Sequence, residues 1–237
     1  MRQMCALTLA LSVACLTFDT GCHSSQRLTP AGILTESEVR DLQAAAIRQA
    51  PFFLNRIPAG RERQFGFDNR EQFARILPGP PFTVCSIGPD QVLGETVDGR
   101  DIQVLNEFRV PLIADGRARA LLTIEPVEGG YRATDLGAAT LAGELDQTLR
   151  DQGFNIDSTR QGSILRLYQV RSDFLIPEVA GPGEEIRVIP LKSARIALGL
   201  DSQKPFVSTL TKMLPSIRHA LSSADIAETI PDGVTQP

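Results

Sequence analysis

Cys85 and His219 are the residues of this sequence whose types could combine in nucleophilic catalysis. A cysteine nucleophile needs a neighbouring base to take its proton, and the chain has two histidines, of which His23 lies close to the N-terminus. Cys85 falls within the apolar-leaning segment 83–87, where a cysteine is typically a small buried hydrophobe. We therefore expect Cys85 to be buried and unreactive, and His219 to be an ordinary residue of the last helix.

Carboxylates and arginines suggest three further kinds of site. Two groups of acidic residues could form an acid–base pair or an oxygen cage for Ca²⁺, namely Asp98, Asp101 and Glu107, and the pair Glu184 and Glu185. Arg117 and Arg119 alternate along one expected strand and could bind an anion. Turn positions and exposed strand faces explain these residues more simply. We expect solvated surface residues here and predict no catalytic residue, cofactor or metal.

The composition removes several classes of function. The sequence has no Gly-x-Ser-x-Gly nucleophile elbow, no phosphate-binding loop ending in Lys-Ser or Lys-Thr and no His-Glu-x-x-His helix. Its 24 basic and 28 acidic residues give a net charge of −4. The arginines are dispersed, so no nucleic-acid footprint is expected. With no tryptophan and two tyrosines, the chain has little aromatic material for stacking on bases or sugars.

The first 22 residues have the pattern of an export signal. Arg2 precedes an apolar run, 4–18, which is shorter than the roughly 20 residues that span a membrane. The small pair Thr20-Gly21 then precedes Cys22. This arrangement resembles the lipobox of bacterial lipoprotein precursors, which implies that Cys22 is lipidated, as palmitate labelling would detect, and becomes the mature N-terminus. The resemblance implies a cell-envelope protein, anchored to a membrane and facing the periplasm or the cell exterior.

Two other processing sites remain open. A second box ends at Cys15, after the small residues 12–14, and ordinary signal cleavage after Ser24 would release a soluble chain. Lipidation at Cys22 and ordinary cleavage both leave Cys85 without a cysteine partner, so no disulfide framework is available. A Cys22–Cys85 bridge would require a signal that is retained or cut earlier.

Apolar residues at helical spacing predict four helices. The predicted segments are 35–50, capped by Thr35 and Glu38 and ended by Pro51; 68–77, capped by Asp68 and Glu71 and ended by Pro78; 138–149, stopped by Gly153; and a last helix from about Pro205 to Ser222 with a kink at Pro215. The first helix carries Val39, Leu42 and Ile47 on its apolar side, which needs a sheet face to cover.

Short apolar runs between turn residues predict the strands. The expected strands are 83–87, 92–97, a meander over 102–134, 164–170, 174–179 and 186–191. Asp98-Gly99, Asp115-Gly116 and Gly129-Gly130 are the expected turns of the first part, and Gly181-Pro182-Gly183 separates the last two strands. In the meander, Phe108, Val110 and Leu122 or their alternates are expected to meet the first helix.

These elements predict an α+β fold, with an antiparallel sheet, a meander, and helices packed on one face. The element order over 35–191 loosely resembles cystatin-like folds, in which a curved sheet wraps a helix, and this resemblance carries no functional residue. We expect a signal peptide at 1–21, a polar linker at 22–34, a single domain at 35–222 and a flexible tail at 223–237.

Three classes of function fit the sequence. The first is a non-catalytic envelope lipoprotein that binds another envelope protein or a small ligand and meets the membrane through its N-terminal lipid. The second is an enzyme that uses Cys85 or a carboxylate pair. The third is a structural or assembly component that adds an edge strand to a partner or to another copy of itself. The tethering signal and the missing catalytic motifs favour the first class.

Overall fold

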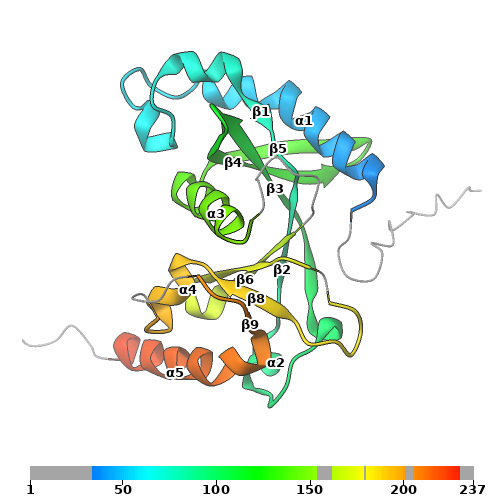
Figure 1. Ribbon diagram of the computed structural model, residues 1–237, viewed down its shortest axis with the longest axis vertical. Helices are drawn as coiled ribbons and strands as arrows, with labels where there is room; N and C mark the ends of the chain where they lie inside the picture. Colours follow the sequence, from blue (N-terminus) through cyan, green and yellow to red (C-terminus); the bar gives the residue numbers. More distant parts are fainter. Residues whose placement is uncertain (1–33, 154–161, 179, 201–204, 230–237) are drawn as a thin grey trace, which may run out of the picture.

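The computed structural model describes residues 34–153, 162–178, 180–200 and 205–229, with side chains described up to residue 223. Over these residues the chain has the predicted α+β fold, with a mostly antiparallel open sheet and helices around it (Figure 1). The strands are β1 (Leu77–Pro78), β2 (Phe82–Ser86), β3 (Gln103–Ala114), β4 (Arg117–Val127), β5 (Gly130–Gly137), β6 (Ser163–Leu167), β7 (Ser172–Ile176), β8 (Arg187–Pro190) and β9 (Ser208–Thr209).

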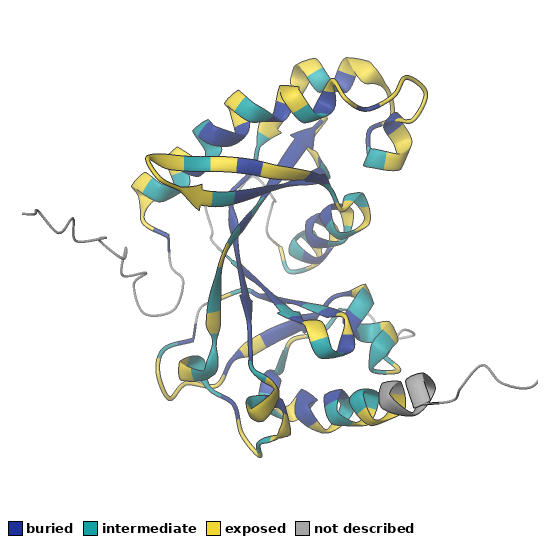
Figure 2. Ribbon diagram, turned by 180° about the vertical axis from the view of Figure 1, so that it is seen from behind, coloured by how far each residue is buried: buried dark blue, intermediate teal, exposed yellow. Residues whose placement is uncertain are grey.

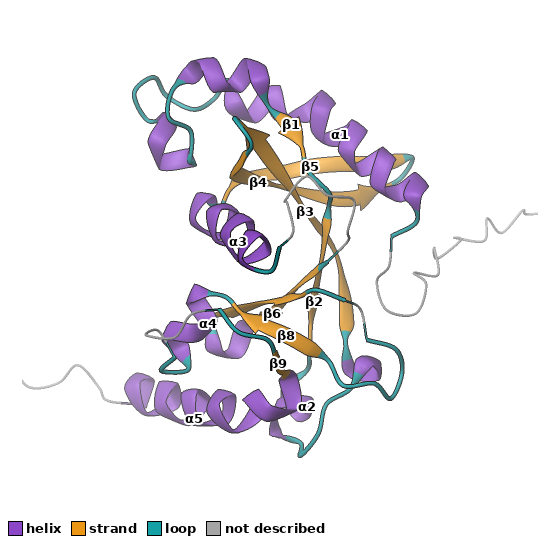
Figure 3. Ribbon diagram, viewed as in Figure 1, coloured by secondary structure: helices purple, strands orange, loops and turns teal. Residues whose placement is uncertain are grey.

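The helices and short 3₁₀ turns lie around this sheet (Figure 3). The α-helices are α1 (Glu36–Leu54), α2 (Pro89–Leu93), α3 (Ala139–Asp151), α4 (Lys192–Ala197) and α5 (Leu210–Thr229). The 3₁₀ turns are η1 (Glu62–Phe65), η2 (Arg70–Arg75), η3 (Gly99–Asp101) and η4 (Tyr168–Val170).

The strand order is β5-β4-β3-β2-β6-β7-β8-β9, with β1 paired to β3. The expected meander is confirmed, because β3, β4 and β5 follow one another as antiparallel neighbours. One pairing differs from a purely antiparallel sheet, since β2 runs parallel to β6. A parallel pair needs a long crossover, and here the meander and α3 supply it. All five residues of β2 are buried, as expected for a strand covered on both faces.

Helices cover both faces of the sheet, so the expectation that they pack on one face is wrong. Leu122 of β4 packs in a core cluster with α1, which we call the α1 core, and its neighbour Leu121 packs in a second cluster with α3, the α3 core. Successive residues of a strand point to opposite faces, so α1 and α3 lie on opposite sides of β4. A third cluster, the α5 core, joins α5 to the other end of the sheet. The buried apolar residues of the described chain therefore form three clusters.

Helix α1 begins as predicted and ends later. Thr35 and Glu38 form the capping box, with the Thr35 side chain accepting from the Glu38 backbone N–H and the Glu38 carboxylate accepting from the Thr35 N–H at 2.7 Å. Pro51 does not end the helix, which continues to Leu54. Pro51 has no N–H to donate to the carbonyl of Ile47. Because Ile47 is 60% exposed, water can hydrate that carbonyl instead.

The expected partner of α1 is confirmed with one exception. Leu42 is fully buried in the α1 core together with Phe108, Val110 and Leu122 of the meander. Ile47 points to solvent instead, so its prediction as a core residue is wrong. Gln49 adds a polar contact to the same interface, because its amide bonds the backbone of β5.

The hairpin between β3 and β4 turns where predicted. Asp115 and Gly116 have φ values of 52° and 69°, the left-handed pair that a two-residue hairpin of this type requires. The turn predicted at Gly129-Gly130 lies one residue earlier, because Val127 pairs with Gly130 across β4 and β5 and the turn residues are Glu128 and Gly129. The predicted turn at Gly181–Gly183 also lies between two strands, β7 and β8, and the Glu184 N–H donates to the Gly181 carbonyl there.

The predictions for 92–97 and for Asp98-Gly99 are wrong. Gly88 and Pro89 open α2, which occupies 89–93, so no strand forms there. Asp98 caps η3 instead of turning a hairpin, with its carboxylate accepting from the Arg100 N–H. Asp98-Gly99 is compatible with a hairpin turn and with a capped 3₁₀ turn. The backbone pairing of Asp98 with Glu185 favours the 3₁₀ turn.

Two predicted helices have shifted bounds. The second helix is the 3₁₀ turn η2, capped by Asn69 and not by Asp68. The last helix starts at Leu210, because the preceding Ser208 and Thr209 pair with β8 as β9. It includes Pro215 and continues to Thr229, beyond residue 222, where the sequence analysis ended the domain.

Candidate binding cleft beside helix α3

Helix α3 is tied to the β3–β4 hairpin by a buried carboxylate. The Asp146 side chain is 3% exposed and accepts from Arg150 Nε at 2.9 Å, while Arg117 Nη1 of β4 lies 3.8 Å from it. Arg150 also donates to the Gly116 carbonyl at the hairpin tip. These contacts, with the left-handed Gly153 just beyond the C-terminal end of the helix, set where α3 stops over the sheet.

A second carboxylate joins α3 to α4. Glu144 accepts from the backbone N–H of Lys192, and Arg195 Nη2 lies 3.8 Å from Glu144 Oε1. Burial raises the pKa of the Glu144 carboxyl to about 7, with a smaller contribution from Asp173, while Arg195 and Lys192 act in the opposite direction. The described structure therefore holds a carboxyl that titrates near neutral pH, two helical turns before the end of α3.

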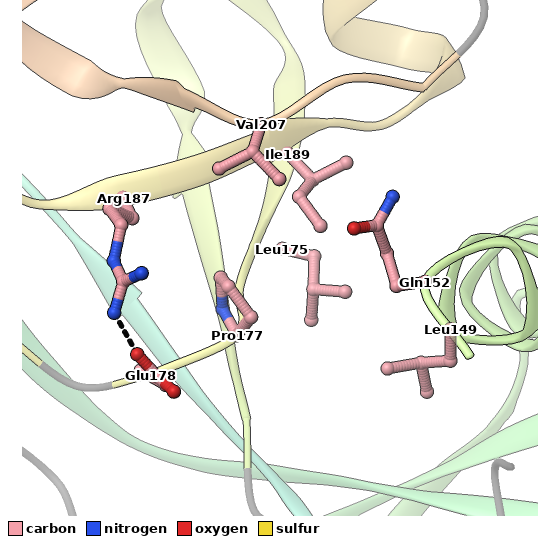
Figure 4. Close-up of a pocket in the computed structure, with 8 residues that line it drawn as sticks. All are labelled: Leu149, Gln152, Leu175, Pro177, Glu178, Arg187, Ile189 and Val207. Atoms are coloured by element: carbon pink, nitrogen blue, oxygen red, sulfur yellow. Dashed lines mark hydrogen bonds and ion pairs between the residues drawn. The ribbon is translucent and has the colours of Figure 1, made fainter. Parts of the chain in front are cut away.

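A cleft of about 220 Å³ opens between the end of α3 and the strands β7 and β8 (Figure 4). Its floor is apolar, because Leu175 and Ile189 are buried members of the α3 core. Leu149 approaches from the helix, and Val207, 50% exposed, lies at the sheet side just before β9. Pro177 completes the apolar lining.

Polar groups mark the mouth of the cleft. Arg187 of β8 forms an ion pair with Glu178, and both side chains are largely exposed. Gln152, the C-cap of α3, extends its amide from the helix toward the strands (Figure 4). The cleft thus combines an apolar floor with one guanidinium and with one amide that can donate and accept hydrogen bonds.

A groove between α4 and α5 is the second candidate. It measures about 580 Å³ and is lined by residues that include Ile196, Pro215 and His219. His219 is exposed on α5, as predicted. None of the lining residues is buried, so this groove lacks the closed apolar floor of the cleft beside α3. We therefore favour the α3 cleft as the binding site.

Cys85 is buried and is not activated. Its thiol is 1% exposed, donates to the Ile164 carbonyl across the parallel β2–β6 pair, and carries a pKa raised to about 12 by burial. His219 lies in the groove between α4 and α5. The expected burial of Cys85 is confirmed, and the raised pKa favours an unreactive thiol, because a nucleophilic cysteine needs a lowered pKa.

The acidic residues considered for an acid–base pair or a calcium site serve local structure. Asp98 pairs with Arg100, which lowers the pKa of its carboxyl, and Asp101 accepts from the Asp98 N–H at 2.9 Å. Glu107 pairs with Arg109 on the same strand. Glu184 accepts from the Gly181 N–H within its turn. Among the described residues, no group of three or more His, Cys, Asp or Glu side chains could hold a metal ion.

Arg117 and Arg119 do not form a common anion site. Arg117 faces Asp146 of α3, as described above, and Arg119 pairs with Asp68 at 2.9 Å. Arg119 is also only 18% exposed, so the expectation that it is a solvated surface residue is wrong. Each arginine joins β4 to a different neighbouring segment.

The residues that line the cleft were missed by sequence reasoning. They come from four stretches spread over residues 149–207, and only the sheet order brings them together. One weak signal in the sequence indicates that Glu144 is partly buried, because this residue lies beside Leu141 and Leu145 on the apolar stripe of α3. Cys22 and His23 lie outside the described residues. In the described part of the chain, no helix is long and apolar enough to cross a membrane.

Comparisons of this chain with protein-family models, with curated proteins and with solved structures find no match.

Proposed function

We propose that this protein is an exported, lipid-anchored, non-catalytic binding module, and that the cleft beside α3 takes a small apolar group of its ligand. The observation that supports this most is the convergence of Leu149, Leu175 and Ile189 on one opening, from a helix and two strands. Apolar side chains at an open cleft lose contact with water when a ligand covers them, which favours binding.

The size and polarity of the cleft limit the kinds of ligand that it could bind. At about 220 Å³ the cleft is smaller than the roughly 300–1,000 Å³ of most small-molecule sites, so a short acyl chain or a single ring fits better than a large molecule. Gln152 can hydrogen-bond a neutral polar group at the mouth. The Arg187 guanidinium already faces Glu178, so a strongly acidic head group would compete with that carboxylate.

Addition of an edge strand to a partner has less support. The outer edge of β5 is engaged by α1, because Gln49 donates to the Tyr131 carbonyl at 3.0 Å and accepts from the Ala133 N–H at 2.9 Å. A side-chain amide in this position occupies the backbone groups that a partner strand would need. The cleft remains the better candidate.

The binding site can be tested by filling its mouth. Val207→Trp places a bulky ring over the cleft, and we expect it to weaken binding of 1-octanol or of an anilinonaphthalene dye by roughly tenfold or more, since the apolar contact is lost. Val127→Trp, on the exposed end of β4, is the matched control and should bind as the native chain does. Equal binding by both variants would place the probe elsewhere.

The anchor is tested separately. Cys22→Ser should abolish metabolic labelling with palmitate if Cys22 carries the lipid. Labelling that persists, or a mature N-terminus at Ser25 found by mass spectrometry, would contradict the proposed lipidation. Neither outcome bears on the cleft.

A further inference from the structure

The outer side of α1 ends in a surface that is both basic and apolar. It comprises the second half of the helix and the loop that follows, and we call it the α1 surface. Its residues, all exposed, are Ile47, Arg48, Pro51, Phe52, Arg56, Arg61 and Arg63. The opposite side of the helix is buried in the α1 core, so this is its free side (Figure 2).

Among the residues that the structure describes, no acidic side chain pairs with the arginines of the α1 surface. Arg48, Arg61 and Arg63 form no ion pair with any described residue, although ten other ion pairs are present in the described structure. The one acidic side chain between residues 44 and 63 is Glu62, which is buried against Arg70 at 3.0 Å. This basic segment belongs to a chain whose net charge is −4, so its positive charge is local.

An exposed aromatic ring lies between Arg48 and Arg56 in the sequence. Phe52 is 54% exposed, with the Arg56 guanidinium 3.7 Å from its ring centroid and the Phe53 ring edge-on at 5.3 Å. Ile47 is exposed one and a half turns earlier on the same helix. Arginine beside exposed aromatic and aliphatic side chains on a helix is the composition of elements that lie in a membrane interface.

The chain length between Cys22 and this helix permits such an arrangement. The 13 residues from Cys22 to Thr35 span at most about 45 Å, since an extended chain covers roughly 3.3–3.6 Å per residue. Helix α1, with 19 residues, is about 28 Å long. A lipid on Cys22 would therefore leave α1 within reach of the bilayer along its whole length.

We propose that the α1 surface docks on an anionic membrane, with Phe52 and Ile47 entering the interface and the four arginines meeting lipid phosphates. The choice of a membrane as the partner rests on the proposed export and anchoring at Cys22. Docking here orients the domain with α1 toward the bilayer. The α3 cleft lies on the opposite side of β4 from α1, and so remains free to bind its ligand.

The absence of tryptophan from the sequence allows a site-specific test with the full chain. Phe52→Trp places a single fluorophore in the α1 surface, and Leu93→Trp places one at the exposed end of α2 as the matched control. We expect the emission of the Phe52→Trp chain to shift to the blue with phosphatidylglycerol vesicles and not with phosphatidylcholine vesicles. The Leu93→Trp chain should not shift with either. Because the emission reports one position, insertion of the apolar run near the N-terminus does not mimic the result.

Charge removal completes the test. Each arginine near an anionic surface contributes roughly fivefold to membrane partitioning. The comparison uses the lipid concentration at which the Phe52→Trp chain shows half of its full emission shift. At that concentration, adding Arg48→Ala and Arg61→Ala to the Phe52→Trp chain should reduce the emission shift to roughly a tenth of its value. Lys192→Ala with Lys212→Ala is the charge-matched control, since it removes two positive charges outside the α1 surface. It should leave the emission shift unchanged.

Three outcomes would overturn the proposal. They are no shift with either lipid, an equal shift with both lipids, and an equal shift for the Phe52→Trp and Leu93→Trp chains. Binding of an acidic protein to the α1 surface without any vesicle response would assign the surface to a protein partner. Palmitate labelling of Cys22 is measured independently, so failure of docking and failure of anchoring are distinguishable.

Discussion

Helix α3 and helix α1 cover opposite faces of the same strand, yet they use charge differently. On α3, Glu144 and Asp146 are nearly buried, and each meets a partner from another element. On the outer side of α1, Arg48 meets none in the described structure. A charge that is already satisfied holds the fold together, whereas an exposed charge without a partner is available to a ligand or a surface. Helix α3 borders the cleft for which we propose ligand binding, and the end of α1 carries the surface for which we propose membrane contact.

The largest expected effect comes from the buried side of α1. Leu42→Asp would place an uncompensated carboxylate in the α1 core, and we expect a loss of roughly 4 kcal/mol or more in the free energy of unfolding. Thermal or urea unfolding measures it. A matched Ile47→Asp substitution on the exposed side of the same helix should cost little. If Leu42→Asp left the transition unchanged, α1 would lie outside the cooperative core.

Asp146 should be the most costly polar residue of α3 to remove. Asp146→Ala deprives Arg150 and Arg117 of their carboxylate, but both arginines remain partly hydrated, so we expect a loss of roughly 2 kcal/mol. Urea unfolding at neutral pH provides the measurement. A loss no larger than that of an exposed ion pair, under about 1 kcal/mol, would remove the distinction between α3 and the surface.

Glu144 gives α3 a pH dependence. A raised folded-state pKa of about 7 means that the folded chain keeps the proton while the unfolded chain, with an ordinary pKa of 4.5, releases it. Stability is therefore expected to fall as pH rises from about 4.5 to 7, and the loss remains above that range. Glu144→Gln keeps an acceptor for the Lys192 N–H but cannot titrate. The fall in the free energy of unfolding between about pH 4.5 and 7 should therefore be smaller in this variant by roughly 1–2 kcal/mol. Identical slopes for the native chain and the variant between pH 5 and 7 would show that Glu144 titrates normally.

The smallest expected effect lies on the α1 surface. Arg48→Ala removes no contact with a described residue, so the free energy of unfolding should change by no more than about 0.5 kcal/mol. The same substitution should weaken binding to anionic vesicles, which separates stability from contact with a partner. A destabilisation as large as that of Asp146→Ala would mean that Arg48 holds the fold.

Local elements were predictable wherever neighbouring residues determine them. The capping box of α1 links Thr35 to Glu38, three residues apart, and the β3–β4 turn needs only Asp115 and Gly116 in left-handed conformations. The same local logic failed at Asp98-Gly99, where a hairpin and a capped 3₁₀ turn use the same residues. Pairing with a segment near residue 185 decided between them, and no local pattern contains that information.

Local sequence patterns were sufficient to predict the α+β class, the meander and the burial of Cys85, because alternation, turn residues and apolar context act over a few positions. Tertiary structure alone decided the parallel β2–β6 pair, the cleft beside α3 and the exposure of Ile47 and Phe52. These features depend on contacts between residues tens of positions apart. Burial, and with it the pKa of Glu144, is set by what the rest of the chain places around a side chain, so it exists only once the fold has formed.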